Sequence, residues 1–272
     1  MGWPNNYVQG VYDSNNELLG IDDGNGGVLG SSEPSKNLVA CIVGNDTSAS
    51  FLDISDNIAN LAVEAGNTNA FANAGYFTTT AGSVTGGLNI PQSKLLWNPY
   101  SESIIVSFLL TKATPVGNEV IFGIGTQANT ITDDGFYLSH RTTGKLRVVP
   151  IKSYVAATGS VDSTASVSGT DKLITVAYDA TIGSWYLYVN GALSDTYTNA
   201  TTFGGFFYLN QISTADIRVG NYSTSSASAV NLVQGSALQI AKKSGGLPIN
   251  MNRLVKRLYA APKLPITVSE WP

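Results

Sequence analysis

Residues 172–198 read KLITVAYDATIGSWYLYVNGALSDTYT, and this stretch decides the fold. Two apolar runs in it, LITVAY and WYLYV, alternate with a period of two and are rich in β-branched and aromatic residues, which is typical of half-buried strands. Asn190-Gly191 follows the second run, and both residues tolerate the positive φ of a tight hairpin turn. The stretch therefore predicts three consecutive antiparallel strands, at about 172–179, 184–189 and 192–198.

Similar apolar runs recur along the chain, separated by turn residues, and no exact repeat is visible. This arrangement predicts an all-β sandwich or jelly roll rather than a propeller or solenoid. Residues 56–65 fit a short helix or a continuing strand equally well, because periodicity does not decide at this length. The other strands are expected at 37–43, 47–54, 71–80, 86–90, 93–97, 102–112, 120–126, 135–141, 145–154, 203–210, 215–222 and 237–243.

A strand ending in Tyr178-Asp179, a short turn and then WYLYVNG resembles the central meander of concanavalin A-like (laminin-G-like) jelly rolls. The resemblance covers roughly residues 70–262 and implies a two-sheet antiparallel jelly-roll sandwich. Such domains occur in lectins, glucanases, adhesins and many bacteriophage appendage proteins. The resemblance therefore indicates the fold more strongly than it indicates a function.

Two parts of different character divide the chain. Residues 37–272 are expected to form the sandwich domain, with its core at about 70–262, and residues 1–36 an extended N-terminal arm and linker. Residues 247–262 predict one short C-terminal helix, capped by Asn250 or Asn252, with apolar residues on one face. Residues 264–268 then suit a closing strand, and Trp271 is expected to pack into the fold.

The N-terminal arm is rich in Gly and Asn but also carries apolar residues that a disordered tail would lack. It predicts short extended pieces joined by turns at 13–16 and 22–27. Its pattern resembles the N-terminal segments of phage tail-fibre and decoration proteins, which implies an anchoring arm that becomes ordered on a partner. The alternative is an extra strand of its own domain. The expected anchoring residues are Trp3, Tyr7, Val11, Tyr12, Leu18, Leu19 and Ile21.

No metal or other cofactor is predicted. The acidic turn at 22–27 lacks side-chain ligands at two of the positions that a calcium loop needs, because Gly24 and Gly26 occupy them. Cys41 is the only cysteine, so it forms no internal disulfide and is expected to be a buried, inert thiol.

The charge of the chain limits its partners. The formal net charge is −4, only 12% of residues are charged, and no basic block is present, which argues against nucleic acid. No apolar run is long enough to cross a membrane, and the N-terminus does not resemble a secretion signal. A neutral Ser/Thr-rich β surface suits either a secreted domain or burial against copies of the same chain, for which we expect a homotrimer.

Catalytic residues are not apparent. Glucanases of the resembled fold carry an E-x-D-x-x-E pattern on one strand, and no such pattern occurs among the six glutamates. His140 is the only histidine and is expected to be a surface residue at a strand end. We therefore predict that the protein is not an enzyme.

Sugar binding is more plausible, because lectin-type sites combine an aromatic platform with polar donors. Trp185 and Leu187 share one strand face and are expected in the core, whereas Tyr186 and Tyr188 share the other face. That second face is expected either to meet solvent or to pack against protein. The candidate ligand-binding residues are Tyr186, Tyr188, Tyr197, Tyr208, Asn210 and Tyr222.

Two functional hypotheses follow. The first is a phage virion protein, a tail-fibre or capsid-surface subunit that contacts other virion proteins through its arm and a host-surface glycan through its lectin-like sandwich. A protein without a secretion signal suits this location, since virions leave the cell by lysis. The alternative is a stand-alone carbohydrate-binding or polysaccharide-degrading module.

Overall fold

The structure is a computed structural model. It describes residues 35–44, 97–99, 101–124, 135–152, 155–156, 160–198, 217–219, 231–232, 237–262, 265–267 and 270–272. It also describes short strands at 10–12, 18–22, 28–29, 51–53, 77–78 and 88–90. The expected elements at 56–65, 93–96 and 203–210 lie outside these ranges.

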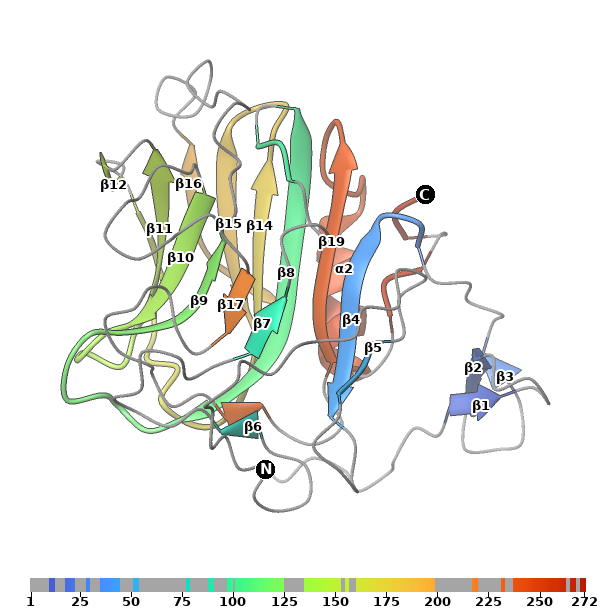
Figure 1. The fold of residues 1–272 in the computed structure, drawn as a ribbon, viewed down its shortest axis with the longest axis horizontal. Coiled ribbons are helices and arrows are strands. Elements are labelled where there is room, and N and C mark those ends of the chain that lie inside the picture. Colours follow the sequence, from blue (N-terminus) through green and yellow to red (C-terminus); the bar gives the residue numbers. More distant parts are fainter. Residues whose placement is uncertain are drawn as a thin grey trace.

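Two antiparallel sheets face each other and form the sandwich (Figure 1). The back sheet has the order β16 (Ala192–Thr198), β15 (Ser184–Val189), β14 (Gly169–Asp179), β8 (Glu102–Lys112), β19 (Ala237–Ser244), β4 (Leu38–Gly44) and β5 (Phe51–Asp53). Two short strands, β18 (Asn231–Leu232) and β6 (Phe77–Thr78), extend it from β8. The predicted all-β, two-sheet jelly-roll sandwich is therefore confirmed.

The front sheet has the order β12 (Val155–Ala156), β11 (Leu146–Lys152), β10 (Gly135–His140), β9 (Glu119–Ile124), β17 (Ile217–Val219) and β7 (Leu88–Ile90). A further short strand, β13 (Val161–Asp162), also pairs with β11. Sequence neighbours in the two sheets are joined mainly by hairpins, as in β10–β11 and β14–β15–β16.

The stretch at 172–198 forms the predicted meander β14–β15–β16. Asn190 and Gly191 have φ values of 52° and 74°, as the hairpin between β15 and β16 requires. The Asn190 side chain also accepts a hydrogen bond from the Leu173 backbone N–H at 2.9 Å, which ties this turn to β14. The other hairpin is held by Asp179, whose carboxylate accepts the Thr181 N–H at 2.9 Å.

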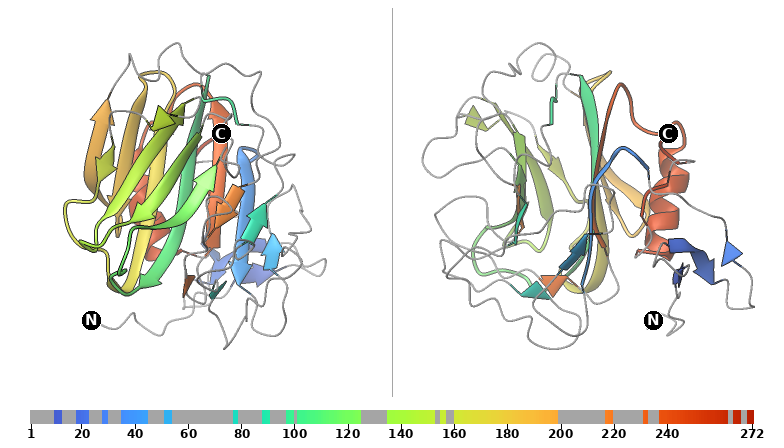
Figure 2. Two further views of the ribbon diagram at one scale, coloured as in Figure 1. Left: turned by 60° about the vertical axis from the view of Figure 1, so that its left-hand side comes forward. Right: turned by 45° about the vertical axis from the view of Figure 1, so that its right-hand side comes forward.

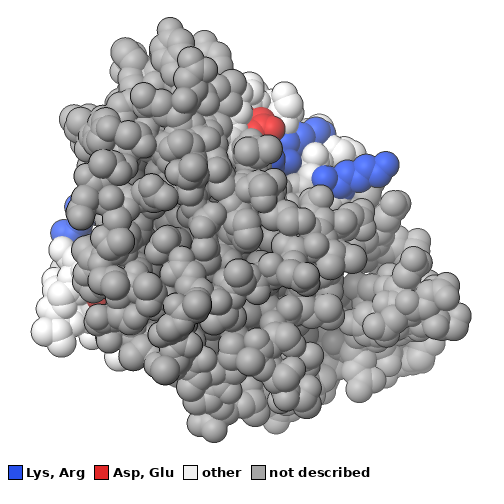
Figure 3. Space-filling model, viewed as in Figure 1, with Lys and Arg blue, Asp and Glu red and all other residues white. Residues whose placement is uncertain are grey.

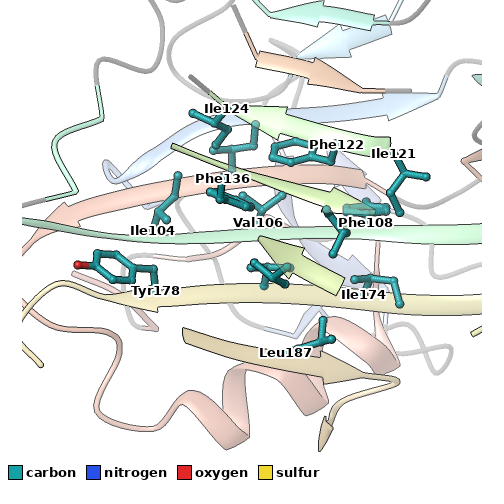
Figure 4. Close-up of a cluster of buried hydrophobic side chains, with 14 of the residues drawn as sticks. Ile104, Val106, Phe108, Ile121, Phe122, Ile124, Phe136, Ile174, Tyr178 and Leu187 are labelled. Atoms are coloured by element: carbon teal, nitrogen blue, oxygen red, sulfur yellow. The ribbon is translucent and has the colours of Figure 1, made fainter. Parts of the chain in front are cut away.

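An apolar core fills the space between the two sheets (Figure 4). Ile104, Val106 and Phe108 enter it from β8, because every second residue of a strand faces the same side. At one end, Trp185 packs against Tyr178 and Phe136, with ring centroids 4.7 and 4.9 Å away. These rings give the two sheets a shared aromatic contact.

The outer face of the back sheet is also buried. Helix α2 (Met251–Ala260) lies across it, on the side away from the front sheet (Figure 2). The Asn250 side chain caps the helix by accepting the Arg253 N–H at 3.2 Å. The residues buried in this second layer are Leu38, Cys41, Ile105, Leu109, Leu173, Ala177, Ala241, Leu254, Leu258, Ile266 and Trp271. The predicted helix, the buried thiol and the packing of Trp271 are confirmed, and Thr267 forms a single β-bridge within the expected closing strand.

Side chains of β16 join the edges of the two sheets. The Asp195 carboxylate accepts the Asp162 N–H of β13 at 3.1 Å, and the Ser194 hydroxyl accepts the Thr164 N–H at 3.0 Å. These bonds occupy the backbone N–H groups of Asp162 and Thr164, which could otherwise hydrogen-bond to a strand of another chain.

Three strands of the N-terminal arm form a small sheet of their own. β1 (Gly10–Tyr12), β2 (Leu18–Asp22) and β3 (Val28–Leu29) pair in that order and pair with neither sheet of the sandwich. The expected extended pieces are therefore present, and these strands do not extend the sandwich. The expected turn at 13–16 and residues 23–27 of the other turn lie outside the described residues. Val11, Tyr12, Leu18, Leu19 and Ile21 lie on them, while Trp3 and Tyr7 lie outside the described residues. The anchoring role and the boundary at residue 36 stay predictions.

Within the described ranges, the structure has no helix long and apolar enough to cross a membrane.

Replacement of Leu258 by Ala tests whether α2 is part of the folding unit. Leu258 is completely buried under the back sheet, so the change should lower the free energy of unfolding by about 2–5 kcal/mol. Urea denaturation followed by tryptophan fluorescence measures the change. Leu193→Ala is the control, because half of that leucine is exposed and its loss should cost under about 0.5 kcal/mol. Equal effects of the two changes would show that α2 does not stabilise the fold.

Candidate functional site

The three predicted sugar-binding aromatics that the structure describes, Tyr186, Tyr188 and Tyr197, do not form one exposed platform. Tyr188 keeps only 4% of its surface exposed, so its ring does not offer a face to a sugar. Tyr186 is half-buried and packs with Leu247 and Met251 against the layer beneath α2. Tyr188 therefore follows the second of the two expected arrangements, in which this strand face packs against protein. Tyr197 is half-buried against the core between the sheets.

Three further candidates, Tyr208, Asn210 and Tyr222, lie outside the described residues, and their proposed role stays a prediction.

His140 is completely buried, which corrects the expectation of a surface histidine. Its Nε2 lies 3.2 Å from the Gly144 carbonyl oxygen and 3.0 Å from the Ser168 hydroxyl. Gly144 has φ +75°, and a Cβ there would lie 2.3 Å from the Ser166 hydroxyl. The ring therefore helps to hold the β10–β11 hairpin closed, next to a glycine that the crowded turn requires. The parity of β10 explains the error, since Phe136, Leu138 and His140 share its inner face.

The outer face of the front sheet brings a different aromatic residue together with charged groups. Tyr137 is half-buried between inward-facing neighbours on β10, so its side chain lies on the outer side. Ser139 pairs with Arg147 of β11, which makes Arg147 a diagonal neighbour of Tyr137 on the same face. Arg147 in turn pairs with Asp162 of β13. Three strands therefore converge on one group of polar side chains.

Arg147 and Asp162 form a bidentate ion pair at the centre of this group. The Nε–Oδ1 and Nη2–Oδ2 distances are both 2.6 Å. The hydrogen bond to Asp162 raises the pKa of Arg147, against the opposing effect of burial. About a third of each side chain stays exposed, so the pair is held in place but remains accessible.

Two cations of this group influence the pKa of Tyr137. Burial raises the pKa of its hydroxyl, and the positive charges of Arg141 and Arg147 partly oppose that shift. The phenol is therefore protonated at neutral pH and can donate a hydrogen bond. Because both arginines act on the same hydroxyl, they lie within electrostatic range of it.

We call this group the Tyr137 face; it consists of Tyr137, Arg141, Lys145, Arg147 and Asp162. Its three cations and one carboxylate give a formal charge of +2 in a chain whose net charge is −4. Where the structure describes side chains, Arg141 and Lys145 have no carboxylate partner. The face therefore presents an aromatic ring, a fixed guanidinium–carboxylate pair and uncompensated positive charge.

Within the described ranges, no group of three or more His, Cys, Asp and Glu side chains is arranged to hold a metal ion.

Sequence reasoning missed the Tyr137 face. The alternation in GFYLSHR placed Tyr137 opposite to Phe136 and Leu138, and this signal was available. The sequence did not predict that β13 pairs with β11, because Arg147 and Asp162 are 15 residues apart and no local pattern links them.

Comparisons with known proteins extend the description of the fold. No family model matches the chain, and no curated protein matches it. Among solved structures, the binding domain of botulinum neurotoxin serotype G aligns with a TM-score of 0.56 at 15% identity, over 82% of this chain and 50% of that one. The binding domain of botulinum neurotoxin DC in complex with SialylT aligns with a TM-score of 0.54 at 14% identity, over 82% and 51%.

A third similar structure is the binding domain of Paraclostridial Mosquitocidal Protein 1, with a TM-score of 0.50 at 15% identity, over 82% of this chain and 52% of that one. This chain spans about half the length of each of these domains. At such identities the similarity defines the fold alone: the chain is a two-sheet β-sandwich, like the binding domains that it resembles.

The buried tyrosines of the back sheet predict a loss of stability at alkaline pH. Burial raises the pKa of Tyr178 and of Tyr188 to about 12. The folded state therefore keeps each phenolic proton after the unfolded chain has begun to lose it, near pH 10. Below pH 10 both states are protonated and nothing is lost; from about pH 10 to 12, each tyrosine should lower the free energy of unfolding by about 1.4 kcal/mol per pH unit.

Urea denaturation at pH 9 and at pH 11.5 measures this effect. Tyr188→Phe is the matched variant, since it removes one phenol and keeps the ring, and it should weaken the alkaline loss by about half. An unchanged pH dependence in this variant would contradict the burial of the Tyr188 hydroxyl.

Proposed function

We propose that this chain is a carbohydrate-binding module that binds a glycan through the Tyr137 face without cleaving it. The observation that carries the proposal is the half-buried ring of Tyr137 beside the fixed Arg147–Asp162 pair on an outer sheet face. One structural neighbour adds support, because the binding domain of botulinum neurotoxin DC, of which this chain covers 51%, was solved in complex with SialylT.

The chemistry of this face suits a sugar. An aromatic ring offers an apolar surface to the C–H face of a pyranose, while its hydroxyl donates a hydrogen bond at the edge. Arg147 donates and Asp162 accepts, so together they fix the orientation of neighbouring sugar hydroxyls. Because the pair already exists in the free protein, little side-chain entropy is lost on binding.

The charge of the face favours an acidic glycan. Arg141 and Lys145 add positive potential in a chain that is acidic as a whole, and such a field raises the local concentration of an anionic ligand. A carboxylated or sulfated sugar would place its anionic group near these side chains. Binding should therefore weaken as the salt concentration rises, since salt screens exposed charges.

The two carboxylates near the Tyr137 face, Asp162 and Asp195, already make structural contacts, which is consistent with binding without hydrolysis. Asp162 is held by Arg147, and Asp195 accepts the backbone N–H of Asp162. Both therefore hold the sheet edges together, whereas hydrolysis requires one carboxyl group to give a proton to the leaving oxygen and the other to act on the opposite side of the sugar.

Titration calorimetry with acidic and neutral oligosaccharides tests the proposed function. Tyr137→Ala should weaken binding of an acidic oligosaccharide at least about tenfold, because the stacking surface is removed. Tyr137→Phe should keep the stacking and lose only the hydroxyl, with a smaller effect. Tyr259→Ala on α2 is the control for removal of a tyrosine elsewhere. Equal affinity of the wild type and Tyr137→Ala would refute this site.

We propose a virion appendage as the second candidate function, with the sandwich displayed outward and residues 1–34 anchoring it to other virion proteins. The supporting observation is that β1, β2 and β3 form a separate sheet outside the sandwich. Removal of residues 1–34 should leave the sandwich folded and abolish incorporation into virions, as measured by immunoblots of purified particles. Unchanged incorporation of the shortened chain would contradict an anchoring role.

A further inference from the structure

The charges of the chain are strongly segregated along its length. Residues 1–34 contain five carboxylates and no Lys or Arg. From residue 217 to the end there are seven cations and a single carboxylate, which gives this segment a formal charge of +6. Opposite charges are therefore concentrated in the N-terminal arm and in the segment that contains α2.

Most cations near α2 have partners, but two on its outer surface do not. Arg257 is paired with Glu270, and Lys242 is paired with Glu102 at 3.0 Å. Arg253 and Lys256 lie one turn apart on the exposed side of α2 and pair with none of the described carboxylates. Figure 3 is viewed from the side opposite to the outer surface of α2, and on the described part of that face Lys and Arg side chains lie at the upper right beside an acidic side chain.

Exposed apolar side chains accompany these two cations. Tyr259, on the same helix, is 37% exposed, and Leu193 of β16 is 50% exposed. The backbone of α2 lies against the β15–β16 turn, where a Cβ added to Gly191 would lie 3.1 Å from the Cβ of Tyr259. We define the α2 surface as Leu193, Arg253, Lys256 and Tyr259; it combines positive charge with apolar area, as protein interfaces do.

The arm leaves the sandwich beside this helix. The Ser35 N–H donates to the Ile266 carbonyl at 2.8 Å, and the Asn37 side chain donates to the Trp271 carbonyl at 2.9 Å. Ile266 and Trp271 pack in the same buried cluster as the inner side of α2. In Figure 2, right, the arm strands and α2 lie on the same side of the back sheet. Acidic arms and cationic helices are thus presented in the same region of the molecule.

We infer that the acidic arm of one copy docks on the α2 surface of a second copy. The described arm strands pair only with one another, so they form a small separate sheet that can bind to a neighbouring copy. Two cationic α2 surfaces would repel each other, whereas an arm that carries five carboxylates is complementary in charge. Because arm and α2 surface are different patches, the contact is head-to-tail and closes into a ring when the rotation allows.

Charge reversal tests this docking in the full chain. Arg253→Glu with Lys256→Glu should shift the protein to monomer and raise the dissociation constant for self-association at least about tenfold, as measured by sedimentation velocity. Asp22→Lys with Asp23→Lys in the arm should do the same. The chain with all four changes should associate again, because the complementarity is restored in reverse. Arg141→Glu with Lys145→Glu is the matched control and should associate like the wild type.

Each other result would overturn the inference. A wild type that stays monomeric across micromolar concentrations shows that no second copy is bound, including the case in which the arm binds its own helix. An oligomer that survives reversal at Arg253 and Lys256 shows that another surface joins the copies. The test is independent of glycan binding, because neither pair of α2 or arm substitutions touches the Tyr137 face.

Discussion

Burial of the back sheet on both of its faces is the constraint on which the structure depends. Its inner face packs on the front sheet, and its outer face packs beneath α2 and the C-terminal segment. β8 and β14 pass through the middle of this sheet, which explains why residues 104–110 and 173–178 are apolar or small and polar with little charge. Two of the polar side chains at its centre, Ser107 and Thr175, form a hydrogen bond with each other across the strands at 2.9 Å.

This constraint also decides which surfaces are free for function. The aromatic residues buried on the back sheet stabilise the fold, and the proposed ligand face lies instead on the outer side of the front sheet. There the alternation of β10 leaves Tyr137 outside the core, and pairing with β11 and β13 supplies a guanidinium and a carboxylate next to it. The lectin-like fold and the polar outer face thus arise from the same strand pattern.

Much of the fold was predictable from local signals. Asn190-Gly191 defined a hairpin because few residue pairs tolerate its backbone angles, and the stripe Leu254, Val255 and Leu258 defined α2. The site was not predictable to the same degree. Alternation separates the two faces of a strand but does not say what covers each of them, and so the sequence left open whether Tyr188 meets solvent or protein. His140 is buried because distant Ser168 and the turn at Gly144 supply its polar partners, which no local pattern reveals.

The most direct measurement is a crystal structure of the protein with a bound acidic oligosaccharide. The proposed function predicts electron density for the sugar over the Tyr137 ring, with its hydroxyls on Arg147 and Asp162 and its anionic group toward Arg141 or Lys145. Density for the sugar on another surface, with the Tyr137 face left to solvent, would contradict the assignment of this face.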